Sequence, residues 1–173
     1  MLDIFISRQH NRHLNKRWNS LPQLPIAYID IRFCAHATED PEKVLKAAYN
    51  LFPEEQTEEL TFDKSNVEGH YGNPITFFEK RIKDKKIIKT LIENLSANIS
   101  PLDKTNLEIT LDRCVEKGSL YLRIDKQAAF QGKIKLGKSD PIRIRIRFRK
   151  NKLEDVTKIC KEIGMLPWNP TLT

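Results

Sequence analysis

Arginine occupies every second position of one short segment, Ile142 to Arg149. Successive side chains on a β-strand point to opposite faces, so this pattern predicts a strand with apolar side chains on its buried face and arginine on the other. Alternate residues of a strand lie about 6.6–7 Å apart, which is on the scale of the spacing between phosphates in a nucleic-acid strand. The planar guanidinium donates two hydrogen bonds to one phosphate, so the row suits a polyanion. The row consists of Arg143, Arg145, Arg147 and Arg149.

Charge is distributed unevenly along the chain, whose formal net charge is +7. Positions 113–152 contain thirteen basic and three acidic residues, whereas positions 38–68 contain three basic and nine acidic residues. Nucleic acid is the commonest partner of a protein this basic, followed by anionic membrane surfaces. No run of about 18 apolar residues predicts a membrane span. The alternative interpretation is an edge strand protected from aggregation, or arginines paired with carboxylates on a neighbouring strand.

Other basic and aromatic residues extend the predicted polyanion-binding surface. Phosphate contacts are expected from the four arginines of the predicted strand and also from Arg123, Lys126, Lys133 and Lys135. Rings that would stack on unpaired bases belong to Tyr71, Tyr121 and Phe130. Packing in the protein core is the alternative role of each ring.

Histidines are the main candidates for catalysis, but their surroundings do not favour it. His36 lies in a His-x-Thr grouping that binds phosphate in phosphoesterases with two such motifs, and the sequence has no second one. His70 beside a tyrosine offers an acid–base pair, although a strand-to-helix junction explains it equally well. His10 and His13 have metal-like spacing but lack nearby carboxylates or cysteines. We therefore expect no enzyme activity.

The three cysteines are widely separated, at Cys34, Cys114 and Cys160. The absence of a CxxC pair argues against a zinc site and against a disulfide framework. Buried reduced thiols are the expectation. Neither a metal nor a cofactor is predicted.

Hydrophobic periodicity predicts an α+β protein with a mainly antiparallel sheet and helices packed on one face. In the N-terminal part we expect a strand over 26–37, a helix from 41 to 52, a hairpin of 60–62 with 67–71, and helices over 75–95 and 100–116. In the C-terminal part we expect a strand over 119–124, a helical turn over 125–132, the arginine strand over 142–148, and a helix over 152–163 capped by Asn151. The second face of the sheet would remain open.

Composition divides the chain into three parts. Residues 1–25 are polar and basic and are expected to form an N-terminal extension, flexible or loosely docked. Residues 26–164 would form a single α+β RNA-binding domain. Residues 165–173 would form a C-terminal tail.

Three segments resemble a known family. They are 26–39, ending in His36-Ala37-Thr38-Glu39, then 68–75, and 120–130 with its Arg123-Ile124-Asp125-Lys126-Gln127 motif. Over residues 26–150 the chain resembles archaeal proteins described as predicted exosome-associated RNA-binding proteins. This resemblance implies a ribosomal-protein-like fold, similar to that of the ribosomal protein that binds 5S RNA. It also implies RNA binding by Arg123, Lys126 and Gln127, a cytoplasmic setting and no catalytic residues.

The predicted function is non-catalytic RNA binding, as an accessory in archaeal RNA processing or ribosome assembly. The partners would be the RNA phosphate backbone and proteins of an RNA-processing complex, with no membrane; the oligomeric state, a dimer included, stays open. One alternative is a protein-interaction subunit that docks partners on its basic and acidic faces. The other is an RNA-processing enzyme that uses His36 or His70.

Overall fold

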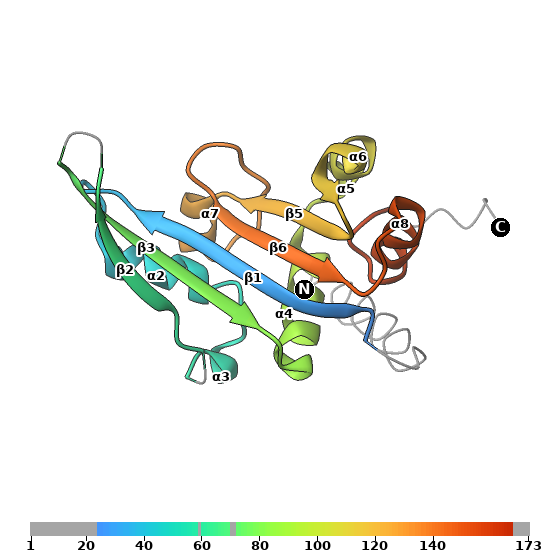
Figure 1. The fold of residues 1–173 in the computed structure, drawn as a ribbon, viewed down its shortest axis with the longest axis horizontal. Helices are drawn as coiled ribbons and strands as arrows, with labels where there is room; N and C mark the ends of the chain where they lie inside the picture. Colours follow the sequence, from blue (N-terminus) through green and yellow to red (C-terminus); the bar gives the residue numbers. More distant parts are fainter. Residues whose placement is uncertain (1–23, 59, 70–71, 168–173) are drawn as a thin grey trace, which may run out of the picture.

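A six-stranded antiparallel sheet forms the centre of the protein, in the order β2-β3-β1-β6-β5-β4 (Figure 1). The computed structural model describes residues 24–167 except 59, 70 and 71. The expected extension therefore lies almost wholly outside the described residues, as do His10, His13, His70 and Tyr71. The strands are β1 (Ile26–Ala35), β2 (Asp63–Glu68), β3 (Pro74–Ile82), β4 (Val115–Glu116), β5 (Ser119–Ile124) and β6 (Ile142–Phe148).

Helices cover one face of this sheet, and α2 and α4 lie directly behind it in Figure 1. The described helices are α2 (Pro41–Tyr49), α3 (Glu54–Thr57), α4 (Lys85–Asn98), α5 (Pro101–Ile109), α6 (Leu111–Cys114), α7 (Lys126–Phe130) and α8 (Leu153–Glu162). Within the described residues, none is long and apolar enough to cross a bilayer. The predicted α+β class, with an antiparallel sheet and helices on one face, is confirmed.

Alternation along the two central strands separates the faces of the sheet. In β1, Ile29, Ile31 and Phe33 are buried against the helices, while Arg32 between them is exposed. In β6, every aliphatic or aromatic residue from Ile142 to Phe148 is at most 1% exposed. The buried faces of β1 and β6 thus anchor the core and direct the intervening residues to the open face.

Side-chain caps fix where several helices begin. Asp84 accepts hydrogen bonds from the backbone N–H groups of Lys86 and Ile87, and Asp125 accepts one from Ala128. Such caps satisfy N–H groups that have no partner inside the helix. Asp84 therefore sets the start of α4 two residues after β3 ends.

The expected hairpin at 60–71 is wrong, and the expected helix over 75–95 is correct only from residue 85 onward, where α4 begins. Residues 63–66, assigned to a turn, begin β2, which pairs with β3 from Asp63 opposite Glu79 to Glu68 opposite Pro74. Residues 75–82 belong to β3, because their β-branched and aromatic side chains fit a pleated surface. The true helical stripe begins only after the Asp84 cap.

Three smaller boundaries also differ from expectation. The helix expected over 100–116 is two helices, α5 and α6, followed by β4. Asn151 does not cap α8, because its side-chain oxygen accepts a hydrogen bond from Arg147 instead. Met165 and Leu166, placed in a tail by composition, are at most 2% exposed and belong to the core.

Candidate nucleic-acid interface

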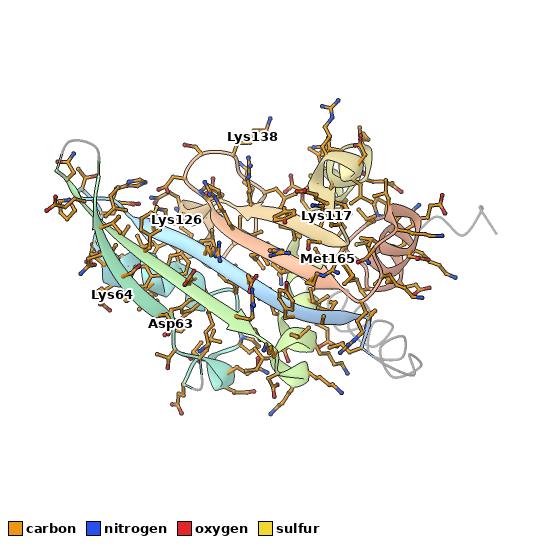
Figure 2. All side chains as sticks on the ribbon, viewed as in Figure 1. Asp63, Lys64, Lys117, Lys126, Lys138 and Met165 are labelled. Carbon is orange, nitrogen blue, oxygen red and sulfur yellow. The ribbon has the colours of Figure 1, made fainter. Side chains whose placement is uncertain are left out.

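The open face of the sheet carries arginines side by side on three neighbouring strands. Arg32 of β1 lies opposite Arg143 of β6, and Arg143 lies opposite Arg123 of β5. Adjacent strands are about 4.8 Å apart, so this arginine row (Arg32, Arg143 and Arg123) spans the middle of the sheet. Figure 2 shows the dense cover of side chains over this face.

The arginine row is poorly neutralised. Arg32 pairs with Glu79 of β3 at 3.3 Å, but both side chains are more than 60% exposed, so water screens the contact. Among the described residues, neither Arg143 nor Arg123 has an ion pair or a side-chain hydrogen bond. Like charges placed directly opposite one another destabilise a sheet. The row is therefore suited to an external anion.

The next row along the strands is built differently and contains an internal carboxylate. Asp30 of β1 lies between Arg81 of β3 and Arg145 of β6. Both oxygens of Asp30 accept hydrogen bonds from Arg81, at 2.7 and 3.1 Å, and a guanidinium nitrogen of Arg145 lies 3.7 Å away. The hydrogen bonds to Asp30 raise the pKa of Arg81. In this aspartate row (Arg81, Asp30 and Arg145), one carboxylate is shared by two arginines and offsets one of their two positive charges.

Two tyrosines enclose the aspartate row. The guanidinium carbon of Arg81 lies 4.4 Å from the ring centre of Tyr28, a cation–π contact. The guanidinium carbon of Arg145 lies 5.8 Å from the ring centres of both Tyr28 and Tyr121. Tyr121 is 43% exposed, so part of its ring remains free to stack on a base.

Arg147 of β6 and Arg149, which follows the end of that strand, bond to the backbone of neighbouring segments. Arg147 donates to the carbonyl of Lys117 in the β4–β5 turn, where Lys117 and Gly118 have positive φ angles of 47° and 73°. Arg149 donates to the carbonyl of Leu24 at 3.1 Å. These hydrogen bonds connect the end of β6 to the β4–β5 turn and to the segment before β1. Only some of the N–H groups of Arg147 and Arg149 therefore remain available to an external anion.

Lys126, expected among the phosphate contacts, is instead 5% exposed and bonded within the protein. Its ammonium donates to Glu39 at 2.8 Å, to the carbonyl of Cys34 at 2.9 Å, and to Asp140. Figure 2 labels Lys126 near the end of β1 that leads into α2. Two of the three segments that carry the family resemblance, 26–39 and 120–130, therefore meet in the ion pair of Glu39 with Lys126, and Lys126 is left out of the surface proposed below.

Burial and ion pairing shift the pKa of Lys126 in opposite directions. Burial alone would lower the pKa of Lys126, but hydrogen bonds to Asp140 and Glu39 outweigh it and raise that pKa. Burial would likewise raise the pKa of Asp140, but Lys126 and then His36 lower it. Lys126 and Asp140 are therefore both charged near neutral pH.

The remaining predicted contacts lie at the margins of the open face. Lys133 and Lys135 are exposed in the segment after α7, which bridges to β5 through Ile124 and Leu136. Gln127 is exposed beside Thr38 and borders a small pocket between α7 and α2. The lysines can extend the arginine row, whereas Gln127 adjoins the helices.

A groove of about 550 Å³ borders β5 on the side of α5 and α6. Its lining includes Tyr121 and Arg123 of β5, Arg113 of α6 and Lys138 of the loop before β6. Figure 2 labels Lys138 at this margin of the sheet. The groove continues the basic surface past the edge of the arginine row.

Sequence reasoning did not identify Arg32 or Arg81 as part of the surface. Both lie on strands with mixed side chains, and only the pairing of β1 with β3 and β6 places them beside the β6 arginines. The polar residues between the aliphatic ones in β1 were a usable signal for the open face. The register of the strands was not available from the sequence.

Comparison with known proteins gives consistent matches. A family model described as RNA binding matches residues 28–148. RNA-binding protein PAB1135 of Pyrococcus abyssi is 38% identical over 139 residues, covering 78% of this chain and 90% of that protein. Uncharacterized protein MJ0213 of Methanocaldococcus jannaschii is 33% identical over 147 residues, covering 79% and 97%.

A solved structure supports the same relationship. Mth689, described as a DUF54 protein from Methanothermobacter thermautotrophicus, aligns with a TM-score of 0.65 and 29% identity, covering 80% of this chain and 98% of that one. Since the family model spans most of the chain, including all six strands except the first two residues of β1, this protein belongs to the family described as RNA binding.

Proposed function

We propose that this protein binds RNA without catalysing a reaction, through phosphate contacts on the open face of its sheet. The observation that carries the proposal is the arginine row, in which Arg143 and Arg123 have no partner among the described residues. Three guanidinium groups held side by side repel one another until an anion lies between them. A phosphate backbone supplies several anions at regular spacing.

Single-stranded RNA fits this surface better than a duplex. Tyr121 and Phe77 stand on the open face, and each is 43% exposed. Exposed rings on a sheet stack on unpaired bases, whose faces a duplex keeps covered. Phosphate contacts and stacking give affinity with little sequence preference.

An accessory role in archaeal RNA processing or ribosome assembly follows as the finer proposal, in the cytoplasm and with proteins of an RNA-processing complex as further partners. The resemblance to exosome-associated proteins with a ribosomal-protein-like fold supports this role, whereas the name of the Pyrococcus relative supports RNA binding alone. His36, the described candidate for catalysis, is engaged by Asp140 at 3.2 Å, which favours a structural role.

The test is the salt dependence of binding to a fluorescent single-stranded oligouridine. Fluorescence anisotropy should give a dissociation constant that rises steeply with KCl, with a log–log slope of about 0.7 per phosphate contacted. The same sequence in a duplex should bind more weakly. Absence of binding at low salt, or a dissociation constant that does not change with salt, would exclude the proposed surface.

A further inference from the structure

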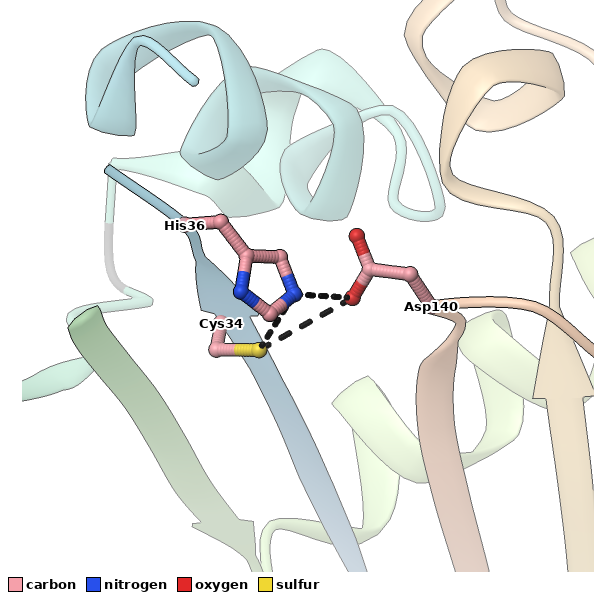
Figure 3. A group of neighbouring side chains, drawn as sticks. All are labelled: Cys34, His36 and Asp140. Carbon is pink, nitrogen blue, oxygen red and sulfur yellow. Dashed lines mark hydrogen bonds and ion pairs between the residues drawn. The ribbon is translucent and has the colours of Figure 1, made fainter. Parts of the chain in front are cut away.

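Three potential metal ligands converge at the end of β1, outside the arginine row. Cys34 is in β1, His36 follows that strand, and Asp140 lies in the loop before β6 (Figure 3). The Cys34 Sγ lies 3.8 Å from the His36 Nε2 and 3.8 Å from the Asp140 Oδ1. The His36 Nε2 lies 3.2 Å from the same oxygen. The three donor atoms thus form a compact triangle.

The size of this triangle matches the coordination shell of zinc. With Zn–S, Zn–N and Zn–O bonds of about 2.3, 2.05 and 2.1 Å at tetrahedral angles, sulfur lies about 3.6 Å from each of the other donors, and nitrogen lies about 3.4 Å from oxygen. The observed separations differ from these by about 0.2 Å. We propose that Cys34, His36 and Asp140 form a zinc-binding site.

The surrounding contacts orient the ligands as a metal site requires. Asp140 turns one oxygen toward His36 and Cys34 and the other toward Lys126. Glu39 accepts hydrogen bonds from the His36 backbone N–H at 3.0 Å and from Lys126 at 2.8 Å. Hydrogen bonds of this kind fix the direction of metal ligands and strengthen binding.

The backbone conformation at Asp140 is compatible with this site. Asp140 has a φ angle of 40°, in the left-handed region that aspartate adopts more readily than most residues with a side chain. Here the conformation accompanies a carboxylate that lies between Lys126 and His36.

Charge balance also favours a divalent ion. When the Cys34 thiol releases its proton to solvent and binds the metal, the site contains three negative groups (Cys34, Glu39 and Asp140) and the positive Lys126. A divalent cation brings their sum to zero. Sulfur and imidazole ligands select zinc over calcium or magnesium, which prefer oxygen.

The site is accessible from the open face. Cys34 is two residues from Arg32 on β1, so the two side chains leave the strand on the same side. His36 is exposed, and Cys34 and Asp140 are half-buried. An ion can therefore enter without unfolding the strand, and the site does not depend on RNA binding.

The experiment measures cobalt and zinc binding by the purified full chain under reducing conditions. His10 and His13 are replaced by Gln throughout, so that their imidazoles do not contribute. We expect one zinc per chain after gel filtration, a rise of several degrees in unfolding temperature, and the sulfur-to-cobalt charge-transfer band in the near ultraviolet when Co²⁺ is added.

Variants assign the ligands. Cys34→Ser should abolish the charge-transfer band, and His36→Gln should abolish the zinc-dependent rise in unfolding temperature. Cys114→Ser, which alters a half-buried cysteine on α6, should change neither. His36 is exposed, so its variant should fold even if Cys34→Ser does not. No bound zinc in the parent chain, or a charge-transfer band that survives Cys34→Ser, would show that the cluster is only an ion pair.

Discussion

Two neighbouring rows of the same sheet contain arginines in different electrostatic settings. In the aspartate row, Asp30 is 6% exposed and bonds Arg81 through both of its oxygens. In the arginine row, the central residue Arg143 faces arginines on both sides. The aspartate row contains its own buried carboxylate, whereas we propose that RNA phosphates supply the anions for the arginine row.

The difference separates arginines that stabilise the sheet from those that would bind RNA. Arginine content alone does not distinguish them, because Arg143 and Arg145 belong to the same strand and point to the same face. What distinguishes them is the residue opposite on β1, which is Arg32 for Arg143 and Asp30 for Arg145. A single aspartate therefore decides which part of the face carries free positive charge.

The largest effect is expected when the whole arginine row loses its charge. The variant Arg32→Gln, Arg143→Gln and Arg123→Gln removes three charge-assisted contacts, each worth about 1.5 kcal/mol or more. Affinity for single-stranded RNA in 0.1 M salt should therefore fall by roughly 1,000-fold or more. The log–log salt slope should decrease by about 2. Fluorescence anisotropy over a KCl series measures both.

A matched variant controls for the lost net charge. Lys43→Gln, Lys46→Gln and Lys86→Gln also removes three positive charges, but from exposed positions on α2 and α4. Its affinity should remain within a few-fold of the parent protein, because those helices cover the opposite face. Equal losses in the two variants would mean that net charge, and not the row, governs binding.

A change in the aspartate row should lower the free energy of unfolding without weakening RNA binding. Asp30→Asn leaves Arg81 and Arg145 without their carboxylate partner and should lower the free energy of unfolding by about 1–3 kcal/mol. Urea denaturation measures this loss, and Asp63→Asn, at an exposed position of β2, is its control. RNA affinity should stay equal or rise, since two guanidinium groups become available. A fall in affinity at unchanged stability would reverse the roles assigned to the two rows.

The two faces of the sheet were predictable from the sequence, but the partners across its strands were not. The strict alternation from Ile142 to Phe148 specified β6 and its exposed arginines, because apolar burial fixes the register of a strand to one face. The misassigned helix over 75–95 hid β3, and with it Glu79 and Arg81. Side chains such as Ile82 fit a helical stripe and a strand equally well, and only pairing with β1 decides between them.

The buried ion pairs of Lys126 with Glu39 and Asp140 show a second limit of sequence reasoning. Lys126 follows an N-cap aspartate in a basic segment, so its charge suggested a phosphate contact. Its burial depends on Glu39 and Asp140, and Glu39 is 87 positions away. Cys34 and Asp140 are 106 positions apart, so no local spacing rule could join them. Clusters assembled from distant segments become visible only in the folded chain.

Base stacking on Tyr121 should contribute less to RNA affinity than the phosphate contacts of the arginine row. Tyr121 lies beside Arg145 with part of its ring exposed, so Tyr121→Leu should reduce affinity for oligouridine by about fivefold, near the lower limit of roughly 1 kcal/mol for base stacking. The salt slope should not change, because no phosphate contact is lost. Tyr121→Phe keeps the ring and should bind like the parent protein; a loss in this variant would assign the effect to the hydroxyl group.

The smallest expected effect is a gain in RNA affinity. It tests Glu79, the only carboxylate among the described residues that contacts the arginine row. Glu79 pairs with Arg32 at 3.3 Å, in a solvent-exposed contact worth less than about 1 kcal/mol. Glu79→Gln should therefore raise RNA affinity about twofold, with little change in stability, because it frees Arg32 and removes a negative charge from the path of the RNA. Glu54→Gln makes the same charge change on α3 and should leave affinity unaltered. If Glu79→Gln binds more weakly than the Glu54 variant, Arg32 needs its carboxylate for orientation and does not act as a free cation.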